Sequence, residues 1–199
     1  MLPVELITDG AMFDLLQDQC NKLLDPNKAL PNYVFRRDFA KFTAFDCAHI
    51  RQQVFGATLK RIALAFGDIS VHYMTIEPDP VKYYWEKLGF YGAASFDVDT
   101  LPSRYIVAMS RDFQSADSFL GRGGDVGVFW GSSLQWGIFC DRISWSICVL
   151  ALSGTTNETL LSDIKVLDKD HLRDYILNEY KYNSSAGLEF LNEYLSNYA

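Results

Sequence analysis

The side chains that most often carry out catalysis or bind metal ions are few in this chain and widely spaced. The three histidines are His49, His72 and His171, and no two of them have the spacing of a zinc motif such as H-E-x-x-H. Surface exposure or a structural hydrogen bond is the simpler role for each of them. We therefore expect no metal site.

Nucleophilic side chains are present, but not in a catalytic pattern. Gly131-Ser132-Ser133 contains half of the G-x-S-x-G motif of serine hydrolases. It lacks the closing glycine and lies between two predicted strands, where a β-turn explains it better. Cys47 and His49 are close in sequence, whereas catalytic cysteine–histidine pairs meet through the fold. We expect no catalytic residue among these candidates.

The glycine-rich segment Gly121–Gly127 matches neither G-x-G-x-x-G nor G-x-x-x-x-G-K-[ST]. A predicted strand follows it, whereas a phosphate-binding loop leads into the N-terminus of a helix. We interpret the segment as a flexible connection into that strand, in preference to a ligand loop, and we expect no cofactor.

The strands that follow give the clearest structural signal in the sequence. The ranges 126–130, 134–140 and 144–152 are apolar and rich in β-branched and aromatic residues. Gly131-Ser132-Ser133 and Asp141-Arg142 separate them. This pattern predicts an antiparallel meander of three strands.

A turn at Asp141–Ser144 would fix the pairing of the last two strands. It would place three pairs on one buried face, namely Cys140 with Trp145, Ile138 with Ile147, and Trp136 with Val149. In this register Cys148 pairs with Gly137 on the other face, so a Cys140–Cys148 bond is disfavoured. Cys20 and Cys47 form no C-x-x-C motif. We expect four free, mostly buried thiols.

Helices are predicted around the meander from apolar residues at helical spacing. The predicted helices cover residues 11–24, 46–66, 81–88, 168–180 and 185–198, and further strands are predicted at 69–76 and 104–110. The aromatic stretch 31–45 favours at least one strand, although a helix is also compatible with it. The sequence thus predicts a single α+β domain over residues 1–199. Its antiparallel sheet would contain the tryptophan-rich meander at 126–152, packed by N- and C-terminal helices.

Composition and charge restrict the function further. The 199 residues are 49% hydrophobic and carry a net charge of −7, which is typical of one globular domain. Phosphate backbones and anionic membranes repel an acidic surface, so neither nucleic-acid nor membrane binding is favoured. The first positive charge is Lys22, and no secretory signal is indicated, so we expect a cytoplasmic protein. The acidity fits a basic protein partner, and it fits equally a protein without one; no oligomeric state is indicated.

Aromatic and turn residues are the candidates for contact with another protein. Asp141 and Arg142 would place an arginine beside tryptophan-rich strands, as in interface hot spots, although both residues are also common in turns. Tyr84 and Trp85 belong to a second aromatic cluster, partly core and partly at the surface of a binding groove. Together with Trp130, these are the residues at which we expect a partner to bind.

Three segments resemble small bacterial immunity proteins, the cytosolic antidotes of polymorphic or contact-dependent toxins. They are Ile76-Glu77-Pro78-Asp79-Pro80 leading into residues 81–84, the turn Leu88-Gly89-Phe90-Tyr91-Gly92, and the run 129–142, which is similar to a W-x-I-x-x-D-R hairpin of such proteins. The resemblance covers part of the chain and transfers no defined binding residue. It implies a non-enzymatic protein that binds and masks a toxin domain. The acidic charge suits a basic nuclease toxin.

A second resemblance is to GNAT-type N-acetyltransferases, in which a pyrophosphate-binding Q/R-x-x-G-x-G/A turn starts a helix. Gln53-Val54-Phe55-Gly56-Ala57-Thr58 opens a helical run here, a strand follows at 69–76, and Trp85-Glu86-Lys87-Leu88-Gly89-Phe90 ends the next helix. The order matches, whereas Thr58 departs from the motif and the turn lies in mid-helix. This resemblance implies an acetyl-CoA-dependent enzyme as the alternative function.

Overall fold

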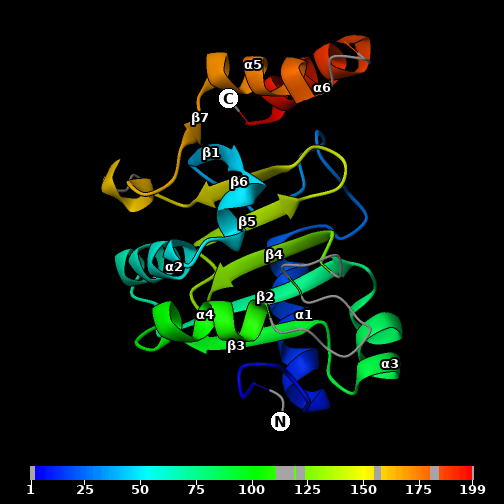
Figure 1. Cartoon of the computed structure of the whole chain (residues 1–199), viewed down its shortest axis with the longest axis vertical. Helices are drawn as coiled ribbons and strands as arrows, with labels where there is room; N and C mark the ends of the chain where they lie inside the picture. Colours follow the sequence, from blue (N-terminus) through cyan, green and yellow to red (C-terminus); the bar gives the residue numbers. More distant parts are fainter. Residues whose placement is uncertain (1–2, 111–118, 120–123, 155–157, 180–183, 199) are drawn as a thin grey trace.

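The computed structural model describes residues 3–110, 119, 124–154, 158–179 and 184–198 (Figure 1). It has an α+β fold around one seven-stranded sheet with the order β3-β2-β4-β5-β6-β1-β7, in which every pairing is antiparallel. The strands are β1 (Lys41–Asp46), β2 (Ser70–Glu77), β3 (Ala93–Asp97), β4 (Val126–Gly131), β5 (Trp136–Asp141), β6 (Ile147–Leu152) and β7 (Val166–Leu167). The predicted fold class is confirmed.

Helices and helical turns connect these strands. The helices are α1 (Gly10–Leu23), α2 (Val54–Ala65), α3 (Glu86–Leu88), α4 (Leu101–Met109), α5 (Lys169–Glu179) and α6 (Ser184–Tyr198). Shorter helical segments are η1 (Cys47–Arg51), η2 (Pro80–Trp85) and η4 (Glu158–Leu161). Within the described residues, no helix has both the length and the apolar character needed to span a bilayer.

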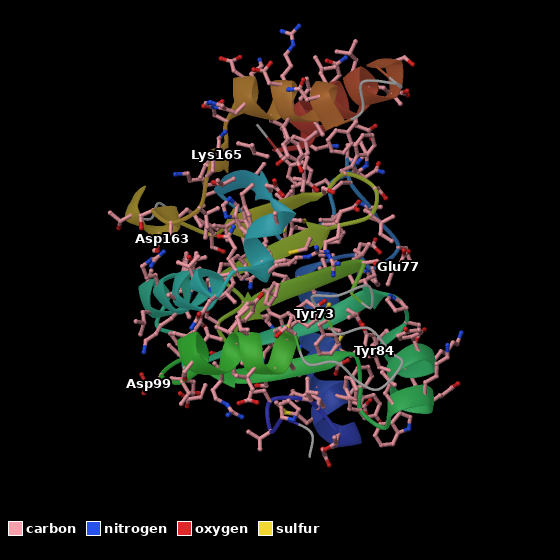
Figure 2. All side chains as sticks on the ribbon, in the orientation of Figure 1. Tyr73, Glu77, Tyr84, Asp99, Asp163 and Lys165 are labelled. Atoms are coloured by element: carbon pink, nitrogen blue, oxygen red, sulfur yellow. The ribbon has the colours of Figure 1, made fainter. Side chains whose placement is uncertain are left out.

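Both faces of the sheet are covered, with α2 and α4 on one side and α1 on the other (Figure 1). Every residue of β5 and β6 is therefore buried. The side chains alternate between two cores. The core on the side of α2 and α4, called the front core, contains Phe129, Ile138 and Leu150. The core on the side of α1, called the rear core, contains Val128, Phe139 and Val149. Figure 2 shows the front layer filled by side chains, with Tyr73 and Tyr84 among them.

The meander is confirmed, but its predicted register is wrong. In the structure Cys140 pairs with Cys148, and Trp136 pairs with Leu152. The connection 142–146 is longer than the predicted turn. Trp136 consequently packs in the front core, whereas Trp145 packs against the rear core. Because both sheet faces are apolar, no alternation of polar residues marks which side of β6 faces which core.

This register also changes the argument about the cysteines. Cys140 and Cys148 face each other on one side of the sheet, so the predicted reason for excluding a bond between them is wrong. The expectation of four free thiols is nevertheless confirmed, and all four are buried.

The strand predicted at 104–110 is also wrong, because these residues belong to α4. Pro102 lies in the first turn of α4, where a missing backbone N–H costs nothing. Tyr105, Ala108 and Met109 are buried at helical spacing, and Arg104 forms a bidentate ion pair with Glu5. The tertiary packing against α2 thus overrides a local pattern that favours a strand.

Two further differences concern shorter elements. The predicted helix 46–66 is divided into η1 and α2, and the edge strands β3 and β7 were not predicted. The other predicted helices are present, and the ambiguous stretch 31–45 contributes to β1. Gly89, with φ at 75°, ends the helical segment 80–88 as expected for a C-terminal glycine.

Candidate functional site

Three of the five residues predicted to bind a partner are buried, so their side chains do not lie at the surface as the prediction requires. Tyr84 and Trp130 are 0% exposed, and Asp141 is 1% exposed. Tyr84 packs in the front core, while the indole nitrogen of Trp130 donates a 3.1 Å hydrogen bond to Gln19 of α1. Because helices cover both sheet faces, aromatic side chains of the central strands reach cores and not the surface.

Asp141 and Arg142 organise the connection between β5 and β6. The Asp141 carboxylate accepts a 2.8 Å hydrogen bond from the backbone N–H of Ser144. Burial raises its pKa, and the backbone N–H groups of the turn partly offset that rise. The Arg142 guanidinium donates to the carbonyl oxygens of Phe119 (2.9 Å) and Gly124 (2.6 Å). The hydrogen bonds of these two residues thus hold the β5–β6 connection in place, which is the turn role considered for them in the sequence.

Trp85 does reach solvent, with 39% of its surface exposed. Its ring stacks on Tyr91 with 4.5 Å between centroids, and Tyr91 stacks on Phe13 of α1 at 4.2 Å. The interplanar angles of 11° and 10° show that the three rings are nearly parallel. The stack holds Trp85 in one orientation. A rigid tryptophan offers a large contact area at a low cost in conformational entropy, as in protein-binding hot spots.

Acidic and apolar side chains are exposed on the elements that carry this stack. On α1, Asp14 and Asp18 are exposed, and Leu15 between them is 51% exposed. Glu86, directly after Trp85, is also exposed. We refer to Trp85, Asp14, Leu15, Asp18 and Glu86 as the Trp85 surface. It combines exposed apolar and acidic side chains, and the exposed Lys82 and Lys87 of the same helical segment add positive charge near Trp85 in the sequence.

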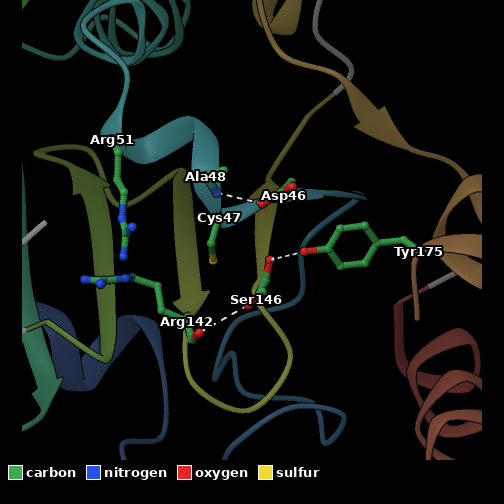
Figure 3. A pocket seen from close by; sticks show the side chains of 7 residues that line it. All are labelled: Asp46, Cys47, Ala48, Arg51, Arg142, Ser146 and Tyr175. Carbon is green, nitrogen blue, oxygen red and sulfur yellow. Dashed lines mark hydrogen bonds between the residues drawn. The ribbon is translucent and has the colours of Figure 1, made fainter. Parts of the chain in front are cut away.

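A small pocket lies between η1 and the β5–β6 connection (Figure 3). Its volume is about 170 Å³, and its lining residues are Asp46, Cys47, Ala48, Arg51, Arg142, Ser146 and Tyr175. Arg51 and Arg142 extend into it toward one another (Figure 3). The Asp46 carboxylate accepts a hydrogen bond from the N–H of Ala48 at 2.7 Å. The two guanidinium groups therefore give this pocket positive character.

Sequence reasoning missed this pocket because its residues come from distant segments. Asp46 ends β1 and Cys47 follows it, Arg142 follows β5, and Tyr175 lies on α5. The Tyr175 hydroxyl donates to the carbonyl oxygen of Ser146 at 3.2 Å, which ties α5 to the rim. No local motif connects these positions, so only the tertiary fold brings them together.

The histidines have the structural roles expected of them. His72 is buried, with Nδ1 3.0 Å from the Ser95 hydroxyl and Nε2 3.1 Å from the Ser70 hydroxyl. Burial lowers the pKa of His72 to about 4. Nε2 of His49 accepts a hydrogen bond from the backbone N–H of Lys165, and Nδ1 of His171 lies beside the carboxylate of Asp168. In the part of the chain that the structure describes, no three potential metal ligands gather into one site.

The serine turn is held by hydrogen bonds to a buried carboxylate. The hydroxyl of Ser132 donates to the Asp68 carboxylate at 3.1 Å, and the backbone N–H of Ser133 donates to the same oxygen. The predicted β-turn between β4 and β5 is therefore confirmed. Residues 121–123 of the glycine-rich segment lie outside the described residues.

The segment that resembles the acetyltransferase turn lies at the start of α2. Gly56 is buried, and a Cβ atom placed there would lie 2.8 Å from Cβ of Tyr105 and 3.2 Å from the carbonyl oxygen of Leu101. Close packing of α2 against α4 is thus a sufficient reason for a glycine at this position.

Comparisons of the chain with protein-family models, with curated proteins and with solved structures found no match.

Proposed function

We propose that this protein is a non-enzymatic, cytoplasmic binding module, and specifically an immunity protein that neutralises a bacterial toxin by covering its functional surface. The observation that carries the proposal is the Trp85 surface, in which a partly exposed tryptophan next to the exposed Glu86 is stacked through Tyr91 onto α1, where Asp14 and Asp18 are exposed. The sequence resemblance to immunity proteins supports the same function. It includes the segment that leads into Trp85.

The charge of the molecule supports a basic partner. The chain carries a net charge of −7, and Asp14, Asp18 and Glu86 are exposed on the two elements that the Trp85 stack joins, although Lys82 and Lys87 are exposed there as well. Opposite charge accelerates diffusional encounter and disfavours wrong partners, while buried aromatic residues supply most of the affinity. A basic nuclease domain is the partner that fits both features, since its substrate-binding surface must attract phosphate.

Binding alone would be sufficient for this function. A stable complex of standard size buries about 800 Å² on each partner, which is larger than the side chains of the Trp85 surface alone. The interface would therefore be centred on Trp85 and extend over neighbouring parts of α1 and of residues 80–91. One molecule of this protein would block one toxin domain without turnover.

The proposal is tested first at the gene itself, since it predicts that a toxin-like protein is encoded directly upstream. That protein is then purified as a catalytically inactive variant. Mixed at equimolar ratio, the two proteins should elute together in gel filtration as a 1:1 complex. The association rate should fall as the salt concentration rises, because salt screens the acidic surface. Absence of a complex, together with turnover of an acyl-CoA by the protein alone, would contradict the proposal.

Two variants locate the interface. A double substitution, Asp14→Lys with Glu86→Lys, changes exposed charges and should slow association at low salt. Leu64→Ala on α2 removes a comparably exposed apolar side chain on the other side of the sheet and should leave the association rate unchanged. Equal association rates for both variants would place the interface elsewhere.

A further inference from the structure

Three of the four cysteines meet at one place in the front core. Cys47 directly follows β1, while Cys140 of β5 and Cys148 of β6 are cross-strand partners. The sulfur atoms of Cys47 and Cys148 are only 3.0 Å apart. The fourth cysteine, Cys20, is buried in the rear core on α1. The cluster brings together residues separated by up to 101 positions.

The backbone explains why Cys47 approaches Cys148. Phe45 of β1 pairs with Cys148, and the backbone N–H of Cys47 donates to the carbonyl oxygen of Ser146 at 3.0 Å. Cys47 and Cys148 therefore lie diagonally across two adjacent strands, on the same face. A disulfide has an S–S distance of about 2.05 Å. The two sulfurs would need to approach by only about 1 Å from their separation in the structure.

Access distinguishes Cys47 from its two neighbours. Cys47 lines the pocket that Arg51 and Arg142 share, whereas neither Cys140 nor Cys148 lines it (Figure 3). A volume of about 170 Å³ admits a molecule of the size of hydrogen peroxide. A small oxidant that enters this pocket would therefore meet the Cys47 sulfur first.

We propose that Cys47 and Cys148 are an oxidisable thiol pair, in which a small hydroperoxide entering the arginine-lined pocket converts the two thiols into a disulfide. This modification site is independent of the proposed partner surface, which lies at the Trp85 surface and does not include the pocket residues.

The reaction balances in two steps. The Cys47 thiolate attacks one peroxide oxygen, so that an S–O bond forms, the O–O bond breaks and the departing hydroxide becomes water with the thiol proton. The Cys148 sulfur then attacks the resulting sulfenic acid, the S–S bond forms, and the S–O bond breaks. The second hydroxide leaves as water with the Cys148 proton. Both sulfurs are oxidised, and the hydroperoxide is the two-electron acceptor.

The protonation state of the cysteine thiols sets the rate at which peroxide oxidises them. Burial raises the pKa of Cys47 well above its ordinary value, so only a small fraction is thiolate at neutral pH. Burial also acts on Cys140, but hydrogen bonds from the two neighbouring thiols and the Arg142 guanidinium outweigh it and lower its pKa. Asp141 faces the same cluster, its carbonyl oxygen 3.6 Å from the Cys47 sulfur. Oxidation through Cys47 should accordingly be slow at pH 7 and accelerate as the pH rises.

The disulfide would join the start of η1 to β6 across 101 residues. Closing so long a loop restricts the unfolded chain, so the oxidised form should melt roughly 5–15 °C higher than the reduced form. Arg51 lies on η1, and its position relative to Arg142 would be fixed by the same bond.

The test is a thiol map of the native protein. The fully reduced chain is treated with hydrogen peroxide at pH 8.5, remaining thiols are alkylated under denaturing conditions, and the digest is analysed by mass spectrometry. We expect one cross-linked pair, Cys47 with Cys148, with Cys20 and Cys140 alkylated. Cys20→Ser should leave this cross-link intact, and Cys47→Ser should abolish it.

Two results would overturn the proposal. One is four alkylated thiols after peroxide treatment of the native protein. The other is a cross-link between Cys140 and Cys148, since those two residues are direct strand partners but neither lines the pocket. The wild-type map decides between these outcomes even where a serine variant folds poorly, and the melting temperature of the oxidised protein gives an independent readout.

Discussion

The indole nitrogen of Trp136 donates a 2.7 Å hydrogen bond to the carboxylate of Asp68, and both side chains are buried. Asp68 lies between α2 and β2, and Trp136 is the first residue of β5. The same carboxylate accepts hydrogen bonds from Ser132 and Ser133 in the β4–β5 turn. Asp68 thus fixes the position at which β5 begins, and thereby the residues that β5 presents to its neighbours.

Replacing Asp68 with Asn should therefore destabilise the fold. The amide keeps one acceptor oxygen but places an NH₂ donor against groups that themselves donate, at a cost of about 2–3 kcal/mol. Asp99→Asn is the matched control, because the Asp99 side chain is 91% exposed and should change stability by no more than about 0.5 kcal/mol. Urea denaturation measures both variants, and equal losses would show that the buried carboxylate has no special role.

Stability should depend on pH through His72. Because burial lowers its folded-state pKa from 6.5 to about 4, the unfolded chain takes up a proton in this range while the folded chain does not. The contribution of His72 is therefore complete above about pH 6.5 and is lost as the pH falls toward 4. Between pH 7 and pH 5 this loss amounts to about 2 kcal/mol.

The measurement is urea denaturation of wild type and His72→Gln at both pH values. The glutamine variant cannot take up the proton, so its stability should fall by about 2 kcal/mol less than that of the wild type between pH 7 and pH 5. Parallel losses in the two proteins would mean that His72 is protonated equally well in the folded and unfolded states.

The sequence was sufficient to predict the strands of the meander but not how they pair. Continuous apolar runs mark β4, β5 and β6 as buried. Because both sides of β6 face a core, the same runs do not show which of its residues point to which side. Residues 104–110 show the opposite problem. Their local pattern favours a strand, whereas packing against α2 makes them helical.

The candidate sites were predictable only in part. The second aromatic cluster was expected to lie partly in the core and partly at the surface, without a decision between Tyr84 and Trp85. The structure buries Tyr84 and exposes Trp85, because the helical segment turns the next side chain outward. Trp130 has the same residue type but belongs to a central strand, where both faces are covered. The pocket beside Cys47 depends on three segments that meet only in the folded chain.

Gly56 should be sensitive to any added side chain. Gly56→Ala places a methyl group 2.8 Å from Cβ of the buried Tyr105, so a loss of about 1–2 kcal/mol should remain after the helix-propensity gain of alanine. Gly154→Ala is the control, because no atom lies within 4 Å of the added carbon. Thermal denaturation compares the two. A neutral or stabilising Gly56→Ala would show that the glycine is not required for the packing of α2 on α4.

Acetyl-CoA should not stabilise the protein. A ligand that binds the native state raises the melting temperature by mass action, with about 2.7 kcal/mol gained at a hundredfold excess over Kd. Since Gly56 has a packing role and the proposed function is protein binding, we expect an unchanged melting temperature in millimolar acetyl-CoA. A rise of several degrees would favour the acetyltransferase alternative.

The contribution of Trp85 to partner affinity tests the central claim most directly. The measurement is a calorimetric titration of the predicted toxin partner, as an inactive variant, with wild type, Trp85→Ala and Leu64→Ala. We expect 1:1 binding that weakens by about 30-fold or more in Trp85→Ala, corresponding to a hot-spot loss of about 2 kcal/mol, and that is unchanged in Leu64→Ala. Wild-type affinity in a folded Trp85→Ala variant would contradict the account, as would the absence of any complex with the wild type.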